Sequence, residues 1–214
     1  MWPCDCAAQI ALLQHYMAAG IPYKYMRYDD EDWKGDKKAL EEVHGYLDGW
    51  DKLREFGIGL GFHAKTLGVG KTFLATYIGR ELIKRGELVA FSNFNDVLSV
   101  YELPYEPRQK REDLLKSSRV LILDEVSQPW SEAQAPLYAA KFEDLIRHRT
   151  NFNKATIYTT NMEPDVLDRL FPRAYSLLSS NSRAITVNGS DVRRESIWDI
   201  DYELLKNGEV RPIC

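Results

Sequence analysis

The sequence predicts an α/β fold in which a parallel β-sheet carries helices on both faces and is preceded by a short helical N-terminal segment. Short apolar runs alternate along the chain with stretches of helical periodicity, which is typical of a parallel sheet. A glycine-rich turn joins one of these apolar runs to a helical stretch. The composition, with 44% hydrophobic and 28% charged residues, indicates a globular chain with a packed core.

The N-terminal part of the chain is predicted to be helical. Residues 5–19 are expected to form one short helix that ends at Gly20 and Pro22. The acidic run over residues 29–32 is expected to be a solvated loop. Residues 36–56 read as one amphipathic helix, because apolar residues recur at spacings of three and four and form a docking stripe of Leu40, Val43, Leu47, Trp50 and Leu53.

The middle of the chain is predicted to form a strand–helix–strand unit. Residues 58–62 are a short apolar run, a glycine-rich turn follows, and helical periodicity continues to Lys84 before a buried strand over 88–91. The polar stretch over 95–116 is expected to be a looser connection. Residues 120–123 are all apolar and are expected to form a central parallel strand.

The last part of the chain continues this alternation. We expect a helix over 131–149, with a proline in its first turns, and a strand over 155–160. Residues 162–178 are predicted to be helical with a break at Pro172, and residues 184–187 are expected to be the last strand. The chain is therefore divided into an N-terminal helical linker (1–55), a core (56–200) and a C-terminal tail (201–214).

The turn Gly68–Thr72 has the residue types of a phosphate-binding loop. Its backbone N–H groups and the N-terminus of the next helix would point at the same anion. Lys71 is expected to reach the β- and γ-phosphate oxygens, and the Thr72 hydroxyl is expected to bind Mg²⁺. The alternative is a glycine turn with an incidental lysine. The first interpretation predicts ATP and Mg²⁺ as cofactors, with contacts to the nucleotide from Thr66, Leu67, Gly68, Val69, Gly70, Lys71, Thr72 and Phe73.

Two further polar groups follow predicted strands. Asp124 and Glu125 follow one apolar run, and Asn161 follows another. Ligands of an open parallel sheet bind at the C-terminal ends of its strands. Asp124 is expected to hold the metal and Glu125 to orient or deprotonate the attacking water, while Asn161 contacts both the γ-phosphate and that water. Alone, the acidic pair fits a solvated turn, and Thr159-Thr160-Asn161 fits a helix N-cap.

Taken together, these segments resemble the AAA+ ATPases of the DnaC/DnaI helicase-loader and IstB transposition-helper group over about residues 20–200. Residues 68–75 match the Walker A loop of that group, residues 121–125 match Walker B, and residues 155–161 are similar to its sensor 1 strand. Residues 189–193 resemble the G-x-D-x-R segment that closes the ATPase core. The resemblance implies an ATPase with a P-loop NTPase (AAA+/ASCE) core, and catalytic roles for Lys71, Glu125, Asn161 and, as the sensor 2 arginine, Arg193.

The chain departs from the family pattern at two positions. Lys65 stands where G-x-x-x-x-G-K-[ST] has its first glycine, so we expect either an unfavourable backbone conformation there or a rearranged loop. Leu177 stands where the R-x-x-S-R-L block has the arginine that reaches a neighbour's ATP. Arg173 and Arg183 are the nearby arginines, and each reads first as a surface or packing residue. We therefore expect slow ATP hydrolysis by the chain alone, because an arginine finger contributes about 10³ to 10⁵ in rate.

The resemblance also bears on partners. In that group an N-terminal module, often zinc-binding, contacts the replicative helicase, and Cys4 and Cys6 resemble the last cysteines of such a module. We expect these cysteines to be reduced and without metal, because two cysteines make no structural zinc site.

The chain has no apolar run of membrane-spanning length, so a cytoplasmic protein is expected. With a net charge of −4, contact with nucleic acid requires a local patch or an oligomer.

Three functions remain open at this point. The leading hypothesis is an ATP-dependent helicase loader for DNA replication that acts on a replicative helicase and single-stranded DNA and forms a homo-oligomer on binding ATP. The second is an IstB-like transposition helper ATPase that assembles on duplex DNA, and the sequence does not separate these two. The third is a weakly active or inactive binding module that regulates a helicase, which Lys65 and Leu177 favour.

Overall fold

The computed structural model describes residues 6–127 and 135–192. Its centre is a five-stranded parallel sheet with the strand order β2-β3-β4-β1-β5. The strands are β1 (Gly59–His63), β2 (Val89–Asn93), β3 (Val120–Asp124), β4 (Ala155–Thr160) and β5 (Ser182–Thr186). The predicted α/β fold is confirmed, and the last strand begins two residues earlier than predicted.

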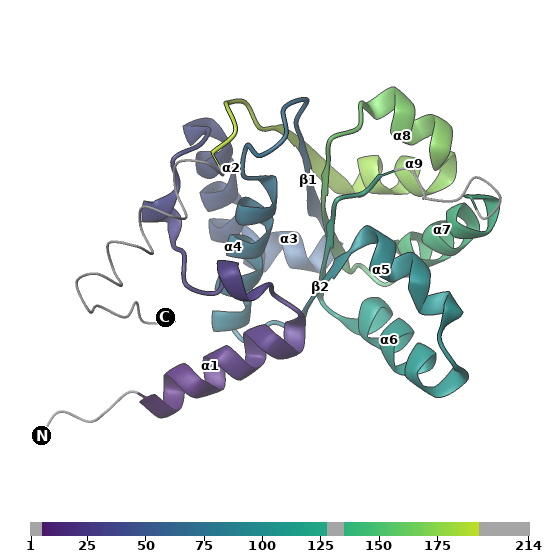
Figure 1. Cartoon of the computed structure of the whole chain (residues 1–214), viewed down its shortest axis with the longest axis horizontal. Coiled ribbons are helices and arrows are strands. Elements are labelled where there is room, and N and C mark those ends of the chain that lie inside the picture. The colour runs from purple at the N-terminus through teal and green to yellow at the C-terminus, as the bar shows by residue number, and fades with distance from the viewer. Residues whose placement is uncertain (1–5, 128–134, 193–214) are drawn as a thin grey trace, which may run out of the picture.

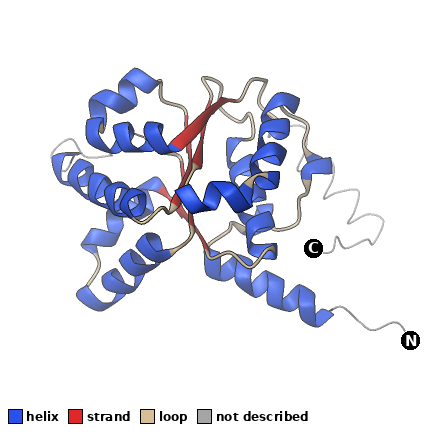
Figure 2. Cartoon of the chain, turned by 180° about the vertical axis from the view of Figure 1, so that it is seen from behind, coloured by secondary structure: helices blue, strands red, loops and turns tan. Residues whose placement is uncertain are grey.

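Helices cover both faces of the sheet, which is seen nearly edge-on between them in Figure 1 and again from behind in Figure 2. One face carries α1 (Cys6–Ala19), α2 (Lys37–Asp48), α3 (Trp50–Phe56) and α4 (Lys71–Lys84). The other face carries α5 (Phe94–Ser99), α6 (Tyr105–Ser117), α7 (Ala135–Asn151), α8 (Pro164–Leu170) and α9 (Pro172–Asn181). Short 3₁₀ turns are η1 (Tyr23–Tyr25), η2 (Asp30–Asp32) and η3 (Val100–Glu102).

The central strand β3 shows why its sequence is a continuous apolar run. Val120 and Ile122 pack into the core on the α4 side, whereas Leu121 and Leu123 pack into the core on the α7 side. Successive side chains of a strand point to opposite faces, so a strand that is covered on both faces needs apolar residues at every position. The polar residue that ends the run, Asp124, is thereby placed at the C-terminal edge of the sheet.

The N-terminal helices belong to the same hydrophobic core as the sheet. Tyr16 of α1, Val43 of α2 and Trp50 of α3 are buried in one cluster with Leu74 and Ile78 of α4. The predicted docking stripe therefore packs against the chain's own core. The division of the chain at residue 55 stays a prediction, and the packing shows that both sides of that division share one core.

Some predicted elements need correction. The helix predicted over 36–56 is two helices, because the chain turns at Gly49, where α2 ends and α3 begins. The acidic run forms a 3₁₀ turn, η2, in which the Asp32 carboxylate accepts from the backbone N–H of Asp29 at 2.9 Å. The predicted break at Pro172 is confirmed, since α9 begins there. Residues 128–134 and 201–214 lie outside the described chain.

The loose connection predicted over 95–116 is wrong, because this stretch is largely helical. Asn93 caps α5 by accepting from the backbone N–H of Asn95 at 3.0 Å. Helix α6 buries only Leu115, so it lacks the broad apolar stripe that would have revealed it. Half-buried charged residues recur along it at spacings of four, and Glu112 lies 3.8 Å from Arg108 and 3.6 Å from Lys116.

None of the helices in the described part of the chain has the length and apolar character that a bilayer crossing requires.

Candidate nucleotide-binding site

The phosphate loop connects the end of β1 to the start of α4. Gly68 has φ 78° and Gly70, the N-cap of α4, has φ 91°, so both residues are left-handed. A Cβ at Gly68 would overlap the Asp191 carboxylate, and one at Gly70 would overlap the Trp33 ring. Glycine is therefore required at both positions for conformation and for space. Gly70 and the first residues of α4, Lys71 to Phe73, line the pocket, so the N-terminus of this helix is placed where anion binding requires it.

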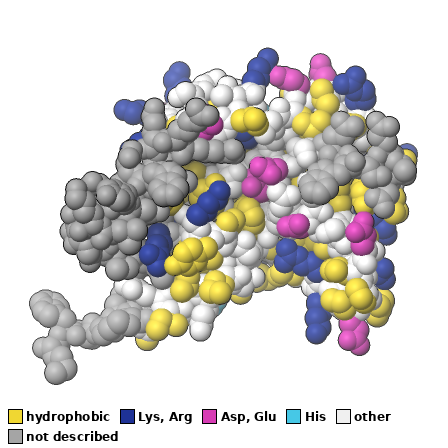
Figure 3. Space-filling view, in the orientation of Figure 1, with side chains coloured by type: hydrophobic (Ala, Val, Ile, Leu, Met, Phe, Trp, Pro, Cys, Tyr) yellow, Lys and Arg dark blue, Asp and Glu magenta, His cyan; other side chains and the backbone are white. Residues whose placement is uncertain are grey.

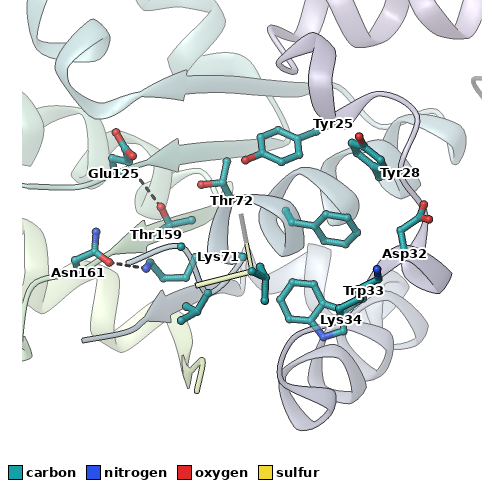
Figure 4. Close-up of a pocket in the computed structure, with 15 residues that line it drawn as sticks. Tyr25, Tyr28, Asp32, Trp33, Lys34, Lys71, Thr72, Glu125, Thr159 and Asn161 are labelled. Atoms are coloured by element: carbon teal, nitrogen blue, oxygen red, sulfur yellow. Dashed lines mark hydrogen bonds between the residues drawn. The ribbon is translucent and has the colours of Figure 1, made fainter. Parts of the chain in front are cut away.

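Lys71 and Asn161 meet in this pocket, although they are far apart in the sequence. Lys71 is the first residue of α4 and is 8% exposed. Its Nζ donates to Oδ1 of Asn161, directly after β4, at 2.5 Å (Figure 4). A lysine ammonium and a neutral amide oxygen are thus already paired at the mouth of the glycine turn.

Thr72, Asp124 and Thr159 form a second polar cluster behind the loop. The Thr72 hydroxyl donates to the Asp124 carboxylate at 2.9 and 3.2 Å, and the Thr159 hydroxyl donates to it at 2.7 Å. Burial raises the pKa of Asp124 above its ordinary value, and the hydrogen bonds from Thr159 and Thr72 oppose that rise. A hydroxyl and a carboxylate are the hard oxygen donors that Mg²⁺ prefers, so these residues fit the metal expected here.

Glu125 lies at the rim of the pocket and is held from two sides. Its backbone has φ 59°, and its N–H donates to the Thr159 hydroxyl at 2.9 Å. Asn93, at the end of β2, donates from Nδ2 to the Glu125 carboxylate at 3.2 Å. The register of β2 against β3 pairs Asn93 with Asp124, which brings the amide beside the acids. Asn93 and Thr159 were missed as site residues by the sequence reasoning, which saw only strand ends.

One wall of the pocket, beside the phosphate loop, is aromatic and comes from the N-terminal segment. Tyr25, Tyr28 and Trp33, which we call the aromatic wall, line the pocket together with Asp32 and Lys34 (Figure 4). The Trp33 ring lies 5.3 Å from the Phe73 ring of α4, centre to centre, and its Nε1 donates to the Asp36 carbonyl at 3.0 Å. Sequence reasoning missed this wall, and the only available signal was the local density of aromatic residues.

Most of the predicted site residues come together. Those that line the pocket are Gly68, Val69, Gly70, Lys71, Thr72, Phe73, Glu125 and Asn161. Asp124 lies beside Thr72, as predicted for a shared metal site. Thr66 and Leu67 are exposed and do not line this pocket. Arg193 lies outside the described residues. The preceding Val192 lines the pocket, and its N–H donates to the Gly68 carbonyl at 3.1 Å.

The structure shows where Lys65 and Leu177, the two residues that depart from the family pattern, lie. Lys65 is exposed, pairs with Glu163 at 3.2 Å, and is not left-handed, since the described non-glycine residues with positive φ are Glu125 and Asn153. Of the two alternatives expected at Lys65, the unfavourable backbone conformation is therefore wrong, and the rearranged loop stays a prediction. Leu177 is half-buried and packs against the core on the α7 side.

Both nearby arginines are exposed and lie in ion pairs, and their interpretation as surface or packing residues rather than a replacement finger stays a prediction. Arg173 lies 3.7 Å from Glu143, and Arg183 lies 2.6 Å from Glu42. Neither lines the nucleotide pocket of its own chain.

On the face shown in Figure 3, acidic and basic side chains are interspersed among apolar ones.

The prediction that the cysteines bind no zinc is not tested by the described residues. Cys4, Cys214 and the side chain of Cys6 lie outside the described part of the chain. Within residues 6–127 and 135–192, no group of three or more His, Cys, Asp or Glu residues could hold a metal ion. The expected reduced, metal-free state of the cysteines remains a prediction.

Comparisons with known proteins bear on the fold. No protein-family model and no curated protein sequence matches the chain. Among solved structures, the DnaC helicase loader matches with a TM-score of 0.66 at 22% identity, over 78% of this chain and 100% of that one. DnaI matches with a TM-score of 0.64 at 20% identity, over 78% and 95% of the two chains. AMPPCP-bound DnaA from Aquifex aeolicus matches with a TM-score of 0.60 at 22% identity, over 83% of this chain and only about half, 53%, of that one. The described chain therefore shares the fold of the DnaC helicase loader and of DnaI, the group that the sequence resembles.

Proposed function

We propose that the protein binds ATP together with Mg²⁺ in the pocket between the phosphate loop and the aromatic wall, and hydrolyses it. One observation carries the proposal. Lys71 and Thr72 at the start of α4, Asp124 at the end of β3 and Asn161 directly after β4 converge at a left-handed glycine turn at the C-terminal edge of the sheet. That edge is where parallel sheets of this kind bind ligands.

The chain's own residues account for binding and for water activation. The N–H groups at the start of α4 and the Lys71 ammonium bind the phosphates, and Lys71 exchanges its contact with Asn161 for phosphate oxygens. Thr72 and Asp124 would hold Mg²⁺, which would supply charge neutralisation for the β- and γ-phosphates. The Glu125 carboxylate takes a proton from the attacking water, and Asn93 fixes that carboxylate when the site is at rest.

The site is tested by three variants that separate binding from chemistry. We expect Lys71→Ala to lose ATP binding, and Glu125→Gln to keep binding but lose turnover. Lys65→Ala is the matched control, because Lys65 precedes the same loop but points to solvent and pairs with Glu163. Calorimetric titration with Mg·ATP and steady-state phosphate release report both quantities. If neither Lys71→Ala nor Glu125→Gln changes its respective quantity, the assignment of the site is wrong.

The biological role that we propose is that of an ATP-controlled helicase loader in the cytoplasm, acting in DNA replication. The fold shared with the DnaC helicase loader and with DnaI supports it. The partners would be a replicative helicase and single-stranded DNA, with a homo-oligomer forming on ATP binding. The γ-phosphate would bias one of two states, as in other nucleotide switches.

This role predicts three measurable behaviours. Turnover by the isolated chain stays below about 1 s⁻¹, because Leu177 supplies no charge to a neighbour's ATP. Particle size increases with a non-hydrolysable ATP analogue and single-stranded DNA. The helicase of the native host binds the immobilised protein. Polymerisation on duplex DNA without helicase binding would instead indicate a transposition helper.

A weakly active module that regulates a helicase is the second candidate, and Leu177 favours it. Such a module would bind the helicase, as a loader does, but would hydrolyse little or no ATP. Helicase binding that is identical in wild type and Lys71→Ala would support this second candidate over the switch.

A further inference from the structure

Arg80 is a buried arginine that joins the helix of the phosphate loop to the N-terminal segment. It lies in α4, which begins at Lys71, and only 1% of it is exposed. A buried guanidinium is costly unless its donors are paired. The partners of Arg80 therefore show which parts of the fold it holds together.

The two terminal nitrogens of Arg80 bind two points of the N-terminal segment. Nη1 donates to the backbone carbonyl of Tyr25, and Nη2 donates to the carboxylate of Asp29, each at 3.0 Å. The guanidinium also lies 5.9 Å from the centre of the Tyr77 ring, on the same helix. Nε has no hydrogen-bond partner among the described residues, so the two terminal nitrogens make the polar contacts to the segment.

The stretch that Arg80 anchors belongs to the aromatic wall. Tyr25 is itself one anchor point, and Tyr28 precedes the other. The backbone N–H of Asp29 in turn donates to the carboxylate of Asp32 at 2.9 Å. Asp32 directly precedes Trp33, the third residue of the aromatic wall. Figure 4 shows Tyr25, Tyr28 and Trp33 on the side of the pocket that faces Thr72 and Lys71. The phosphate loop is anchored by β1 and the first turn of α4, and of the three wall residues it is Trp33 whose ring lies against the loop, at Gly70.

We propose that Arg80 is a positioning residue that holds the aromatic wall where a nucleotide base fits against it. This inference rests on the proposed function and names the residue that gives the pocket its preference for a nucleoside triphosphate over bare triphosphate. Arg80 acts through the wall and touches neither part of the nucleotide. A base gains stacking contacts with the rings, whereas inorganic triphosphate uses the phosphate loop alone.

Two substitutions and one control test this role. Arg80→Met removes both donors, and Arg80→Lys keeps the charge but cannot make the two-point contact of a guanidinium. Arg85→Met is the control, because Arg85 follows the same helix and its Nη1 donates to the Leu47 carbonyl of α2 rather than to the wall. The affinities of all four proteins for Mg·ATP and for inorganic triphosphate are measured by calorimetry, and thermal melting confirms that each is folded.

We expect Arg80→Met to weaken ATP binding by about tenfold, the equivalent of losing the stacking of one base, and to leave triphosphate affinity within about twofold of wild type. Arg80→Lys gives the same pattern with a smaller loss, and it carries the test if the methionine variant does not fold. Arg85→Met binds both ligands as wild type does.

Equal losses for the two ligands would show a merely structural role and overturn the inference. Unchanged ATP affinity, or a wild type that binds ATP no better than triphosphate, would overturn it as well while leaving the phosphate site intact. A wild type that binds neither ligand removes the proposed function, and the inference with it.

Discussion

The Thr159 hydroxyl makes hydrogen bonds to both acids of the candidate site, Asp124 and Glu125. The free energy of unfolding that is lost when this hydroxyl is removed can therefore be calculated. It donates to Asp124 at 2.7 Å and accepts from the Glu125 N–H at 2.9 Å. Thr159→Val keeps the shape and removes both bonds. A hydrogen bond to a charged group contributes about 1.5–3 kcal/mol, and a buried N–H without an acceptor costs about 1–3 kcal/mol. Because local relaxation recovers part of the sum, we expect a loss of about 3 kcal/mol in the free energy of unfolding.

The assay is urea denaturation of wild type, Thr159→Val and Thr159→Ser at pH 7, alongside ATP turnover. Serine keeps the hydroxyl and loses one methyl group, so its loss should be about 1 kcal/mol. Turnover should fall in the valine variant, because neither acid keeps its orientation, and should be largely retained in the serine variant. A valine variant within about 0.5 kcal/mol of wild type, or a serine variant as unstable as valine, would refute this reasoning.

Three further predictions concern the same pocket. Burial holds the pKa of Asp124 above its ordinary 3.8, so the folded protein binds that proton more tightly than the unfolded chain does, and stability falls as pH rises from about 4 through the raised pKa. Asp124→Asn should abolish this fall, which denaturation midpoints at pH 4 and pH 7 will show, and parallel curves for the two proteins would contradict it. Asn93→Ala should raise basal phosphate release by about fivefold at unchanged ATP affinity, because a bond worth about 1 kcal/mol no longer restrains Glu125; a changed affinity would count against this assignment. Gly70→Ala should lower stability by at least about 1–2 kcal/mol and abolish ATP binding in calorimetry, because φ is 91° and the Trp33 ring fills the space, whereas normal binding would show that the loop adapts.

The sheet and the phosphate loop were predictable because their physical demands are local. A strand covered on both faces must be apolar at every position, and Val120–Leu123 satisfies this without reference to the rest of the chain. The turn at Gly68 and Gly70 needs a left-handed backbone conformation at both positions, and a glycine at each position indicates that conformation from the sequence alone. The roles assigned to Lys71, Glu125 and Asn161 stay predictions, although the structure brings these side chains into one pocket.

The missed features depend on contacts between distant segments. Asn93 becomes a site residue only through the register of β2 against β3, which no local pattern encodes. The aromatic wall depends on Arg80 reaching back to Tyr25 and Asp29, more than fifty residues earlier. Helix α6 escaped prediction because it buries one side chain and is otherwise supported by charge pairs on its surface.

The end of α1 has a consequence for protein handling that follows from its place against the sheet. β2 is the outermost strand at one side, and Gly20 packs so closely on the Phe91 carbonyl that a Cβ would approach it to 2.8 Å. An uncovered outer strand offers unpaired backbone groups to other chains and promotes aggregation. Expression fragments that begin after residue 21 should therefore precipitate, and the first helix protects solubility as well as completing the core.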